Sequence, residues 1–147
     1  MANILNISDA ASLGLHTTAY MALDPETSQK GPVVAELLGV SEAHLSKVMQ
    51  RLHHAGLVDS IRGPKGGYKL AVDPEQTSLL EIYEAIEGPI PQTHCLLGRP
   101  VCKGEDCILG GMVKRVNREV RAYLAETRLS NLAGVYRKRD NKKEAVK

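Results

Sequence analysis

The sequence predicts a mainly α-helical fold with one small β-hairpin and a long helix in its C-terminal part. Apolar residues recur every three or four positions through most of the chain and alternate only over two short stretches near its middle. The chain has five Tyr but no Phe or Trp, so we expect aliphatic packing. Its 147 residues suffice for one domain, or for a small domain with a long appended element.

Two helices are predicted near the N-terminus. The first has Ser8 or Asp9 as its cap, runs through "AASLGLHTTAYMAL" and ends at the Asp-Pro breaker at 24–25. The second is the short "GPVVAELLG", with Pro in its first turn and Gly39 at its end. Its Val and Leu residues form an apolar stripe, so we expect this helix to pack against the core.

A third helix, "EAHLSKVMQRLHHAG", is predicted between Ser41, which can cap it, and Gly56, which ends it. Leu45 and Leu52, with the Val and Met between them, make its buried stripe. Only a tight turn containing Gly39 separates it from the second helix. This is the helix-turn-helix arrangement, whose second helix can enter the major groove of DNA.

A β-hairpin is predicted over residues 57–72. The stretches "LVDSIR" and "YKLAV" alternate as strands, and "GPKGG" between them has the composition of a turn with a charged tip. A hairpin in this position is a wing. A fourth helix follows, because Ser78 and Glu81 form a capping box and Gly88-Pro89 ends the apolar run behind it.

One long amphipathic helix is predicted from Ile108 onward, with Lys and Arg on its other faces. Its apolar stripe is too narrow to be surrounded by the chain's own core, so pairing with a second copy is the economical way to bury it. The short amphipathic segment "LSNLAGVY" follows. The tail "RKRDNKKEAVK" lacks apolar periodicity, and we expect it to be disordered.

These elements divide the chain into four parts. We predict that residues 1–76 form a winged helix-turn-helix DNA-binding domain, whose first helix also packs at the dimer. Residues 77–107 would hold a linker helix and a loop with the cysteines, and residues 108–136 the dimerisation helices. Residues 137–147 are the charged tail.

The charge of the chain is unevenly distributed. Its net charge is only +2, yet residues 1–46 carry one Lys against five acidic residues, giving −4. Residues 47–69 carry five Lys or Arg against one Asp, giving +4. Because Lys and Arg neutralise DNA phosphates while polar side chains read base edges, this basic island predicts DNA binding.

The predicted DNA contacts lie on the third helix, away from its apolar stripe, and on the hairpin. A purely solvated helix face is the alternative for the third helix taken alone. Cations on a thin hairpin with a Gly-Gly pair can follow the DNA backbone or enter a minor groove. The candidate DNA-binding residues are Ser41, Glu42, His44, Ser46, Lys47, Gln50, Arg51, Arg62, Lys65 and Tyr68.

The stretch "VAELLGVSEAHLSKVMQRLHHAGLVDSIRGPKGGYKLA" resembles the winged helix-turn-helix signature of the Rrf2 family of bacterial transcription regulators, the IscR and NsrR type. The likeness is strong from the first helix through the wing and looser as far as residue 136. It implies a homodimer on a partly palindromic double-stranded DNA operator, with the third helix in the major groove and the wing tip near the minor groove. Ser46 and Lys47 stand where many members have a Glu-Gln pair, so we expect the operator sequence to differ from theirs.

The three cysteines lie within 13 residues, in "THCLLGRPVCKGEDC". Cysteines that serve packing should be scattered over apolar faces, and in a reducing compartment such a group indicates a metal or redox site. Thiolates are soft ligands, suited to iron-sulfur clusters or zinc. The resemblance implies that Cys95, Cys102 and Cys107 hold an iron-sulfur cluster, with 2Fe-2S favoured and 4Fe-4S as the alternative.

A fourth ligand is missing from the obvious place. Gly110 stands where some members of the family have His, and Ser12 stands where others supply an acidic residue to the partner subunit's cluster. Zinc held by three Cys and one His is the alternative, for which His94 beside Cys95 is awkwardly placed. For His16, the apolar helix around it favours a hydrogen-bonded packing role. The candidate fourth ligands are Asp9, His16, His94 and Asp106.

Other classes of protein are disfavoured. The N-terminus lacks a basic start followed by a long apolar run, and no stretch of eighteen apolar residues occurs, so we expect a cytoplasmic protein without a membrane span. An enzyme is not expected, because the chain has no Cys-x-x-Cys, no paired-His helix motif and no Gly-rich phosphate loop.

The residues and the resemblance together predict a homodimeric transcriptional regulator, taken as a repressor. We expect an iron-sulfur cluster to control its operator binding in response to redox state, nitric oxide or iron-sulfur supply. Loss of the cluster would change the order of the cysteine loop and thereby the spacing of the two wings. A zinc-bound or cluster-free thiol-switch regulator of the same fold is the alternative.

Overall fold

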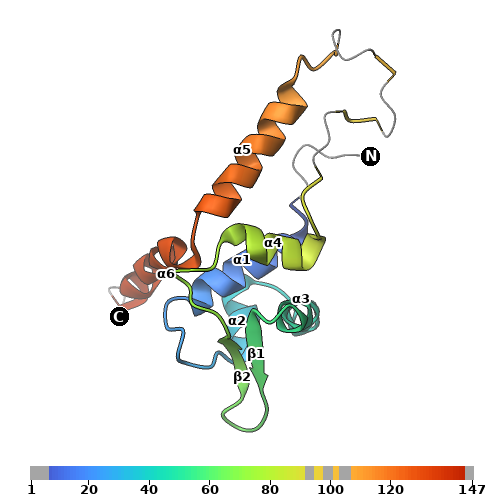
Figure 1. Cartoon of the computed structure of the whole chain (residues 1–147). Helices are drawn as coiled ribbons and strands as arrows, with labels where there is room; N and C mark the ends of the chain where they lie inside the picture. Colours follow the sequence, from blue (N-terminus) through green and yellow to red (C-terminus); the bar gives the residue numbers. More distant parts are fainter. Residues whose placement is uncertain (1–6, 92–94, 98–100, 103–106, 145–147) are drawn as a thin grey trace.

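The structure, a computed structural model, describes residues 7–91, 95–97, 101–102 and 107–144. It has the mainly α fold with one β-hairpin that the sequence predicts (Figure 1). The elements in chain order are α1 (Asp9–Met21), α2 (Gly31–Leu38), α3 (Glu42–His54), β1 (Val58–Ile61), β2 (Gly67–Leu70), α4 (Leu79–Glu87), α5 (Met112–Glu126) and α6 (Leu129–Glu144).

The first three helices begin and end close to the predicted positions. The Ser8 hydroxyl accepts a hydrogen bond from the Ala11 amide at 3.1 Å and caps α1. The Ser41 hydroxyl accepts one from the His44 amide at 3.2 Å and caps α3. Gly39 ends α2 with a φ of 67°, a left-handed conformation that glycine adopts without steric cost. Helices α2 and α3 thus form the predicted helix-turn-helix.

The hairpin is tied to the segment before α2. Strands β1 and β2 pair antiparallel, with Ile61 opposite Gly67. Gln29 adds a second pairing, on β2, because it and Tyr68 exchange two backbone hydrogen bonds of 2.8 Å. The sequence gives no sign of this pairing, since no alternation precedes α2. The pairing holds β2 against the segment that leads into α2.

The core lies where α1, α3 and α4 meet, with the start of α6 closing one side. The predicted apolar stripe of α3 is buried there in full. The capping box of α4 is also as predicted, since Ser78 and Glu81 bond to each other's backbone amides. The largest fully buried apolar side chains are Met21, Leu45, Met49, Leu52, Ile82 and Leu129, with Val34, Val48 and Val58.

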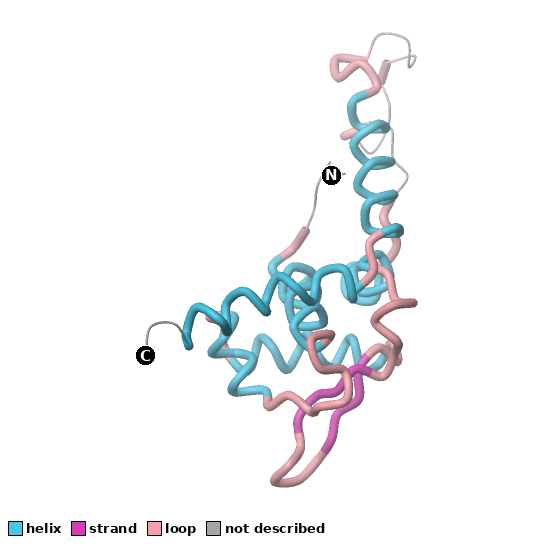
Figure 2. The backbone as a smooth tube through the Cα atoms, turned by 90° about the vertical axis from the view of Figure 1, so that its left-hand side faces the viewer, coloured by secondary structure: helices cyan, strands magenta, loops and turns pink. Residues whose placement is uncertain are grey.

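Helix α5 extends away from this body on the side opposite the hairpin, and α6 returns to pack against α1 (Figures 1 and 2). Helix α5 begins at Met112, later than the expected Ile108. The reason is that Gly110 and Gly111 have left-handed φ values of 51° and 78°, which interrupt a helix. No helix in the described ranges is both long and apolar enough to cross a membrane.

The last helix is longer than the sequence predicts. We expected disorder from residue 137, but the backbone of α6 stays helical as far as Glu144. The tail lacks the apolar periodicity that would mark a packed helix, yet Lys, Arg and Glu are good helix formers. A helix begun by "LSNLAGVY" can therefore continue through such residues.

Replacing Ile82 by Ala should lower the free energy of unfolding by about 2 to 5 kcal/mol, because this fully buried side chain would leave a cavity. The matched control is Ile108→Ala, where the side chain is 97% exposed and the change should stay within about 0.5 kcal/mol. Urea denaturation at one fixed protein concentration measures both. Equal losses of stability in the two variants would contradict this placement of the core.

Candidate DNA interface and cysteine segment

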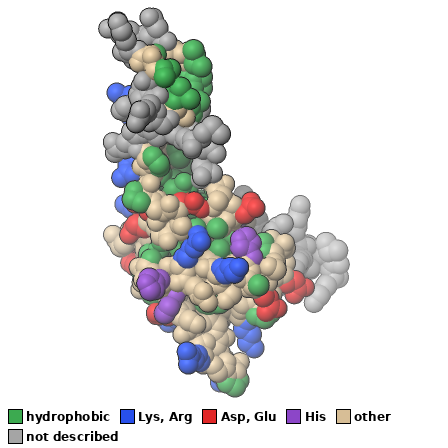
Figure 3. Space-filling model, turned by 90° about the vertical axis from the view of Figure 1, so that its right-hand side faces the viewer, with side chains coloured by type: hydrophobic (Ala, Val, Ile, Leu, Met, Phe, Trp, Pro, Cys, Tyr) green, Lys and Arg blue, Asp and Glu red, His purple; other side chains and the backbone are tan. Residues whose placement is uncertain are grey.

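Helix α3 presents a polar face to solvent. Its apolar stripe faces the core, so the predicted DNA-binding residues on its other side point outward. Among them Glu42, Lys47 and Gln50 are exposed, whereas His44 and Ser46 are half-buried. Figure 3 shows this side of the molecule, where Lys, Arg and His side chains gather above a hairpin that carries further Lys and Arg. The face therefore combines positive charge with short polar groups.

A groove of about 590 Å³ separates α3 from the hairpin. It brings together the predicted residues Glu42 and Ser46 on α3 with Tyr68 on β2. Lys30, just before α2, also lines it and was not predicted as a contact. The sequence could have indicated this contact, because Lys30 directly precedes the first helix of the helix-turn-helix.

The tip of the hairpin carries two exposed cations. Arg62 and Lys65 lie on the turn between β1 and β2, and neither has an ion-pair partner among the described residues. Lys69, lower on the hairpin, is different because its ammonium lies 3.0 Å from the Glu26 carboxylate. The uncompensated positive charge of the hairpin is thus at its tip, where it can meet a phosphate backbone.

Arg51 does not extend freely from α3 as its place in the sequence suggested. Its guanidinium Nη1 donates a hydrogen bond of 3.3 Å to the carbonyl oxygen of Ile86, in the last turn of α4. The predicted set of DNA-binding residues is therefore divided. Most face the groove or solvent, while Arg51 lies between the outward face of α3 and the end of α4.

The three cysteines occupy the segment between α4 and α5. Cys102 is exposed, Cys95 and Cys107 are half-buried, and none forms a disulfide. The Leu97 amide donates a 3.4 Å hydrogen bond to the Cys95 sulfur. Three thiols that are not in disulfides are a donor set that fits a soft metal centre. Among the described residues, however, no three His, Cys, Asp or Glu side chains are grouped closely enough to hold a metal ion.

Two of the four candidate fourth ligands lie on α1, and both are exposed. The Nδ1 atom of His16 is 2.7 Å from the Ser12 carbonyl oxygen, so that nitrogen carries the hydrogen. In the neutral ring Nε2 then has a lone pair that can bind a metal. Asp9 lies in the first turn of α1. His94 and Asp106 fall outside the described residues.

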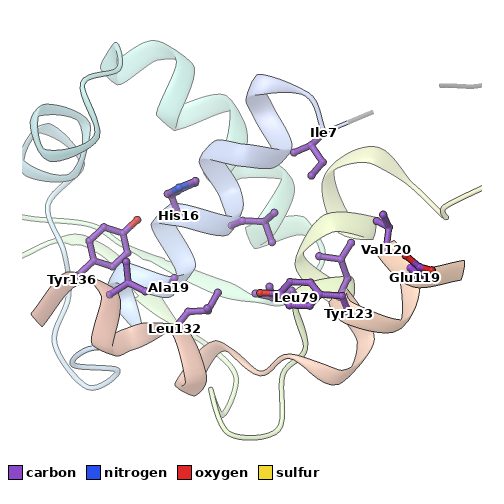
Figure 4. Close-up of a pocket in the computed structure, with 12 residues that line it drawn as sticks. Ile7, His16, Ala19, Leu79, Glu119, Val120, Tyr123, Leu132 and Tyr136 are labelled. Atoms are coloured by element: carbon purple, nitrogen blue, oxygen red, sulfur yellow. The ribbon is translucent and has the colours of Figure 1, made fainter. Parts of the chain in front are cut away.

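An apolar groove of about 560 Å³ runs between α1, α5 and α6. Figure 4 shows Ala19, Leu132 and Val120 lining it, with the rings of Tyr123 and Tyr136 at its sides. Tyr123 and Val135 are about three-fifths exposed here, with values of 60% and 62%. Large apolar side chains grouped on a surface mark an interaction site more often than a free surface.

Comparison with known proteins identifies the regulator class. The Rrf2 family, described as an iron-dependent transcriptional regulator, matches residues 7–134. The HTH-type transcriptional regulator IscR of Photorhabdus laumondii is 33% identical over 110 residues, which cover 71% of this chain and 66% of that protein. IscR of Klebsiella pneumoniae is 32% identical over 117 residues, covering 76% of this chain and 69% of that protein.

A solved structure agrees with these relatives. CymR, the global cysteine regulator of Bacillus subtilis, superimposes with a TM-score of 0.73 and 29% sequence identity over 89% of this chain and 98% of that one. A likeness over this share of the chain confirms the predicted winged helix-turn-helix fold. The chain therefore belongs to the Rrf2 family, whose members are transcriptional regulators and not enzymes.

Proposed function

We propose that this chain is a homodimeric repressor that binds an operator through α3 and the hairpin. An iron-sulfur cluster on Cys95, Cys102 and Cys107 controls its affinity for the operator. The polar face of α3 beside a hairpin with a cationic tip is the observation that carries the DNA-binding assignment. The family description as iron-dependent and the single cysteine-rich segment support the cluster. Repression follows most simply from occupying promoter DNA.

In this proposal, α3 lies in the major groove and the hairpin follows the adjacent backbone. Lys47 and Gln50 are exposed and long enough to reach base edges, and the half-buried Ser46 lies beside them on the groove. Arg62 and Lys65 neutralise phosphates or enter the minor groove. The turn that carries them is rich in glycine, so few bulky side chains hinder this approach. The two copies of α3 in a dimer would read half-sites about 34 Å apart, one turn of DNA.

A second copy of the chain is the proposed occupant of the apolar groove. Helix α5 buries only Val113 and Leu124 within its own chain, so most of its length has no covering element. The groove continues this uncovered surface onto α1 and α6. Burying both in a two-fold interface removes apolar area from water on each protomer, which stabilises the pair.

The cysteines would hold the cluster as thiolates, which are the soft ligands that iron-sulfur centres require. When bound, the cluster supplies a redox-active centre that responds to oxidants, nitric oxide or iron-sulfur supply. We favour the 2Fe-2S form, with Asp9, His16, His94 or Asp106 as candidates for a fourth, weaker ligand. One such ligand would leave the cluster easier to attack than four thiolates would.

A cluster-free thiol switch is the second candidate. It is favoured by the exposure of Cys102, because accessible thiols are the ones that oxidise. The two candidates differ in whether the protein contains iron, so purification under oxygen-free conditions separates them.

Two substitutions should separate base reading from phosphate binding. Arg62→Ala should weaken binding to specific and random DNA alike and reduce the slope of log affinity against log salt by about 1. Lys47→Ala should mainly change base preference, weakening specific binding by about 1 to 3 kcal/mol. Fluorescence anisotropy with both kinds of duplex, at several salt concentrations, measures this. If both variants weaken specific and random DNA equally, the assignment of α3 to the major groove is wrong.

The turn of the wing can be tested at one glycine. An ideal Cβ on Gly66 would lie 2.1 Å from the Ile61 carbonyl oxygen, so Gly66→Ala must deform the turn. We expect operator affinity to fall about tenfold, which corresponds to a strain of roughly 1.4 kcal/mol. The matched control is Gly31→Ala, whose Cβ would meet the Tyr68 ring at an ordinary 3.5 Å. Unchanged affinity in the Gly66 variant would exclude the wing from the interface.

Changing Cys102 to Ser should abolish the visible absorption of anaerobically purified protein, because the cluster would lose one of its thiolate ligands. Analysis of the same samples gives the iron and sulfide content per chain. Sedimentation is the control that the dimer is intact. Absorption and iron content equal to wild type would remove Cys102 from the ligand set. Wild-type protein without iron or sulfide would favour the thiol switch.

A further inference from the structure

Helix α4 lies between the hairpin and the cysteine segment in chain order. The hairpin lies at one end, and the described parts of the cysteine segment lie toward the other (Figure 1). Helix α4 ends at Glu87, directly before this segment, and it packs against α1, α3 and α5. The shortest route from the cysteine segment to the DNA-binding face therefore runs through the last turn of α4.

This last turn is packed directly onto the helices of the DNA-binding part. Ile86 is buried, and an ideal Cβ on Gly14 of α1 would lie only 2.1 Å from its Cδ1 atom. The same Cβ position is 3.5 Å from Val48 of α3, so α1, α3 and α4 converge at Gly14. Close packing of this kind transmits displacement, because interiors have no free volume to absorb it.

A polar contact joins α3 to the same turn. Arg51 donates from Nη1 to the Ile86 carbonyl oxygen at 3.3 Å. The last carbonyls of a helix have no partner within the helix and carry its partial negative charge, so a guanidinium is favoured there. The Glu87 carboxylate adds negative charge to this turn, and it accepts a hydrogen bond from the Ser8 hydroxyl that caps α1.

The pKa of a neighbouring tyrosine is consistent with negative charge at the C-terminal end of α4. The pKa of Tyr83 is raised by its burial and, to a smaller extent, by the charge of Glu87. On the other side of the contact, Arg51 follows Lys47 by one helical turn and so lies on the same surface of α3. Arg51 thus borders the proposed DNA face at one side and the end of α4 at the other.

We propose that Arg51 is a positioning residue that couples operator binding by α3 to the last turn of α4, and through it to the state of the cysteine segment. The first coupling depends only on DNA binding, whereas the second rests on the proposed function of the cysteines. Because coupling between sites is reciprocal, DNA bound to α3 must also steady the end of α4. The sequence suggested instead that Arg51 contacts DNA directly.

The first coupling can be tested without a cluster. The Gly88 amide donates to the Glu84 carbonyl oxygen at 2.9 Å and reports on the last turn of α4. A duplex selected from a random pool by the wild-type protein should slow hydrogen exchange of this amide in cluster-free wild type but not in Arg51→Met. Equal protection in both proteins, or none in wild type, would overturn the proposal.

The second coupling is measured as the ratio of operator affinities of cluster-loaded and cluster-free protein. In wild type we expect a ratio between about 5 and 150, the usual range of such couplings. In Arg51→Met it should fall toward 1 with the salt dependence of binding unchanged, and Arg51→Lys should restore part of it, because a Lys keeps the charge and a donor. Exposed side chains are replaced, so the fold is retained.

Lys47→Met is the matched control, since it removes a cation one turn away on the same helix. It should weaken both forms equally and keep the ratio. If Arg51→Met behaves as this control does and also lowers the salt slope by about 1, Arg51 is a direct phosphate contact and the proposal is wrong. If wild type carries no iron, the proposed function fails, while the hydrogen exchange result still decides the role of Arg51.

Discussion

The close approach of Ile86 of α4 to Gly14 of α1 is the contact on which the arrangement of the other elements depends. It lies where α1, α3 and α4 meet, because Val48 of α3 is 3.5 Å from the position that a Cβ on Gly14 would occupy, and α4 ends one residue after Ile86. Because a side chain at position 14 would overlap Ile86, this approach of α1 to α4 requires glycine. The capped, short helices α2 and α3 gain their stability from this shared core more than from their own propensity.

The molecule separates three kinds of surface, and each suits a different partner. The outward face of α3 and the hairpin tip are cationic and polar, which suits a phosphate backbone and base edges. The groove between α1, α5 and α6 is apolar, which suits a second copy of the chain. The described parts of the cysteine segment lie away from the hairpin, and α4, which ends just before this segment, packs against α1 and α3.

Local signals in the sequence predict the helices and strands well, but they do not predict contacts between distant segments. Capping by Ser41 and the end of α2 at Gly39 depend only on neighbouring residues, and both are found as predicted. The pairing of Gln29 with the hairpin joins segments that show no common pattern. Periodicity places Arg51 outside the apolar stripe of α3, but it cannot tell that the end of α4 lies within reach. For the same reason the three thiols are found by composition, whereas their mutual arrangement depends on how the whole segment folds.

In the proposed function, the state of the cysteine segment controls how tightly a pair of winged domains binds DNA. Hydroxyl-radical footprinting of one promoter fragment with cluster-loaded and cluster-free protein tests this most directly. We expect two protected patches about 34 Å apart along the duplex, with strong protection in one state and weak protection in the other. Identical footprints in both states, or protection with no regular spacing, would contradict it.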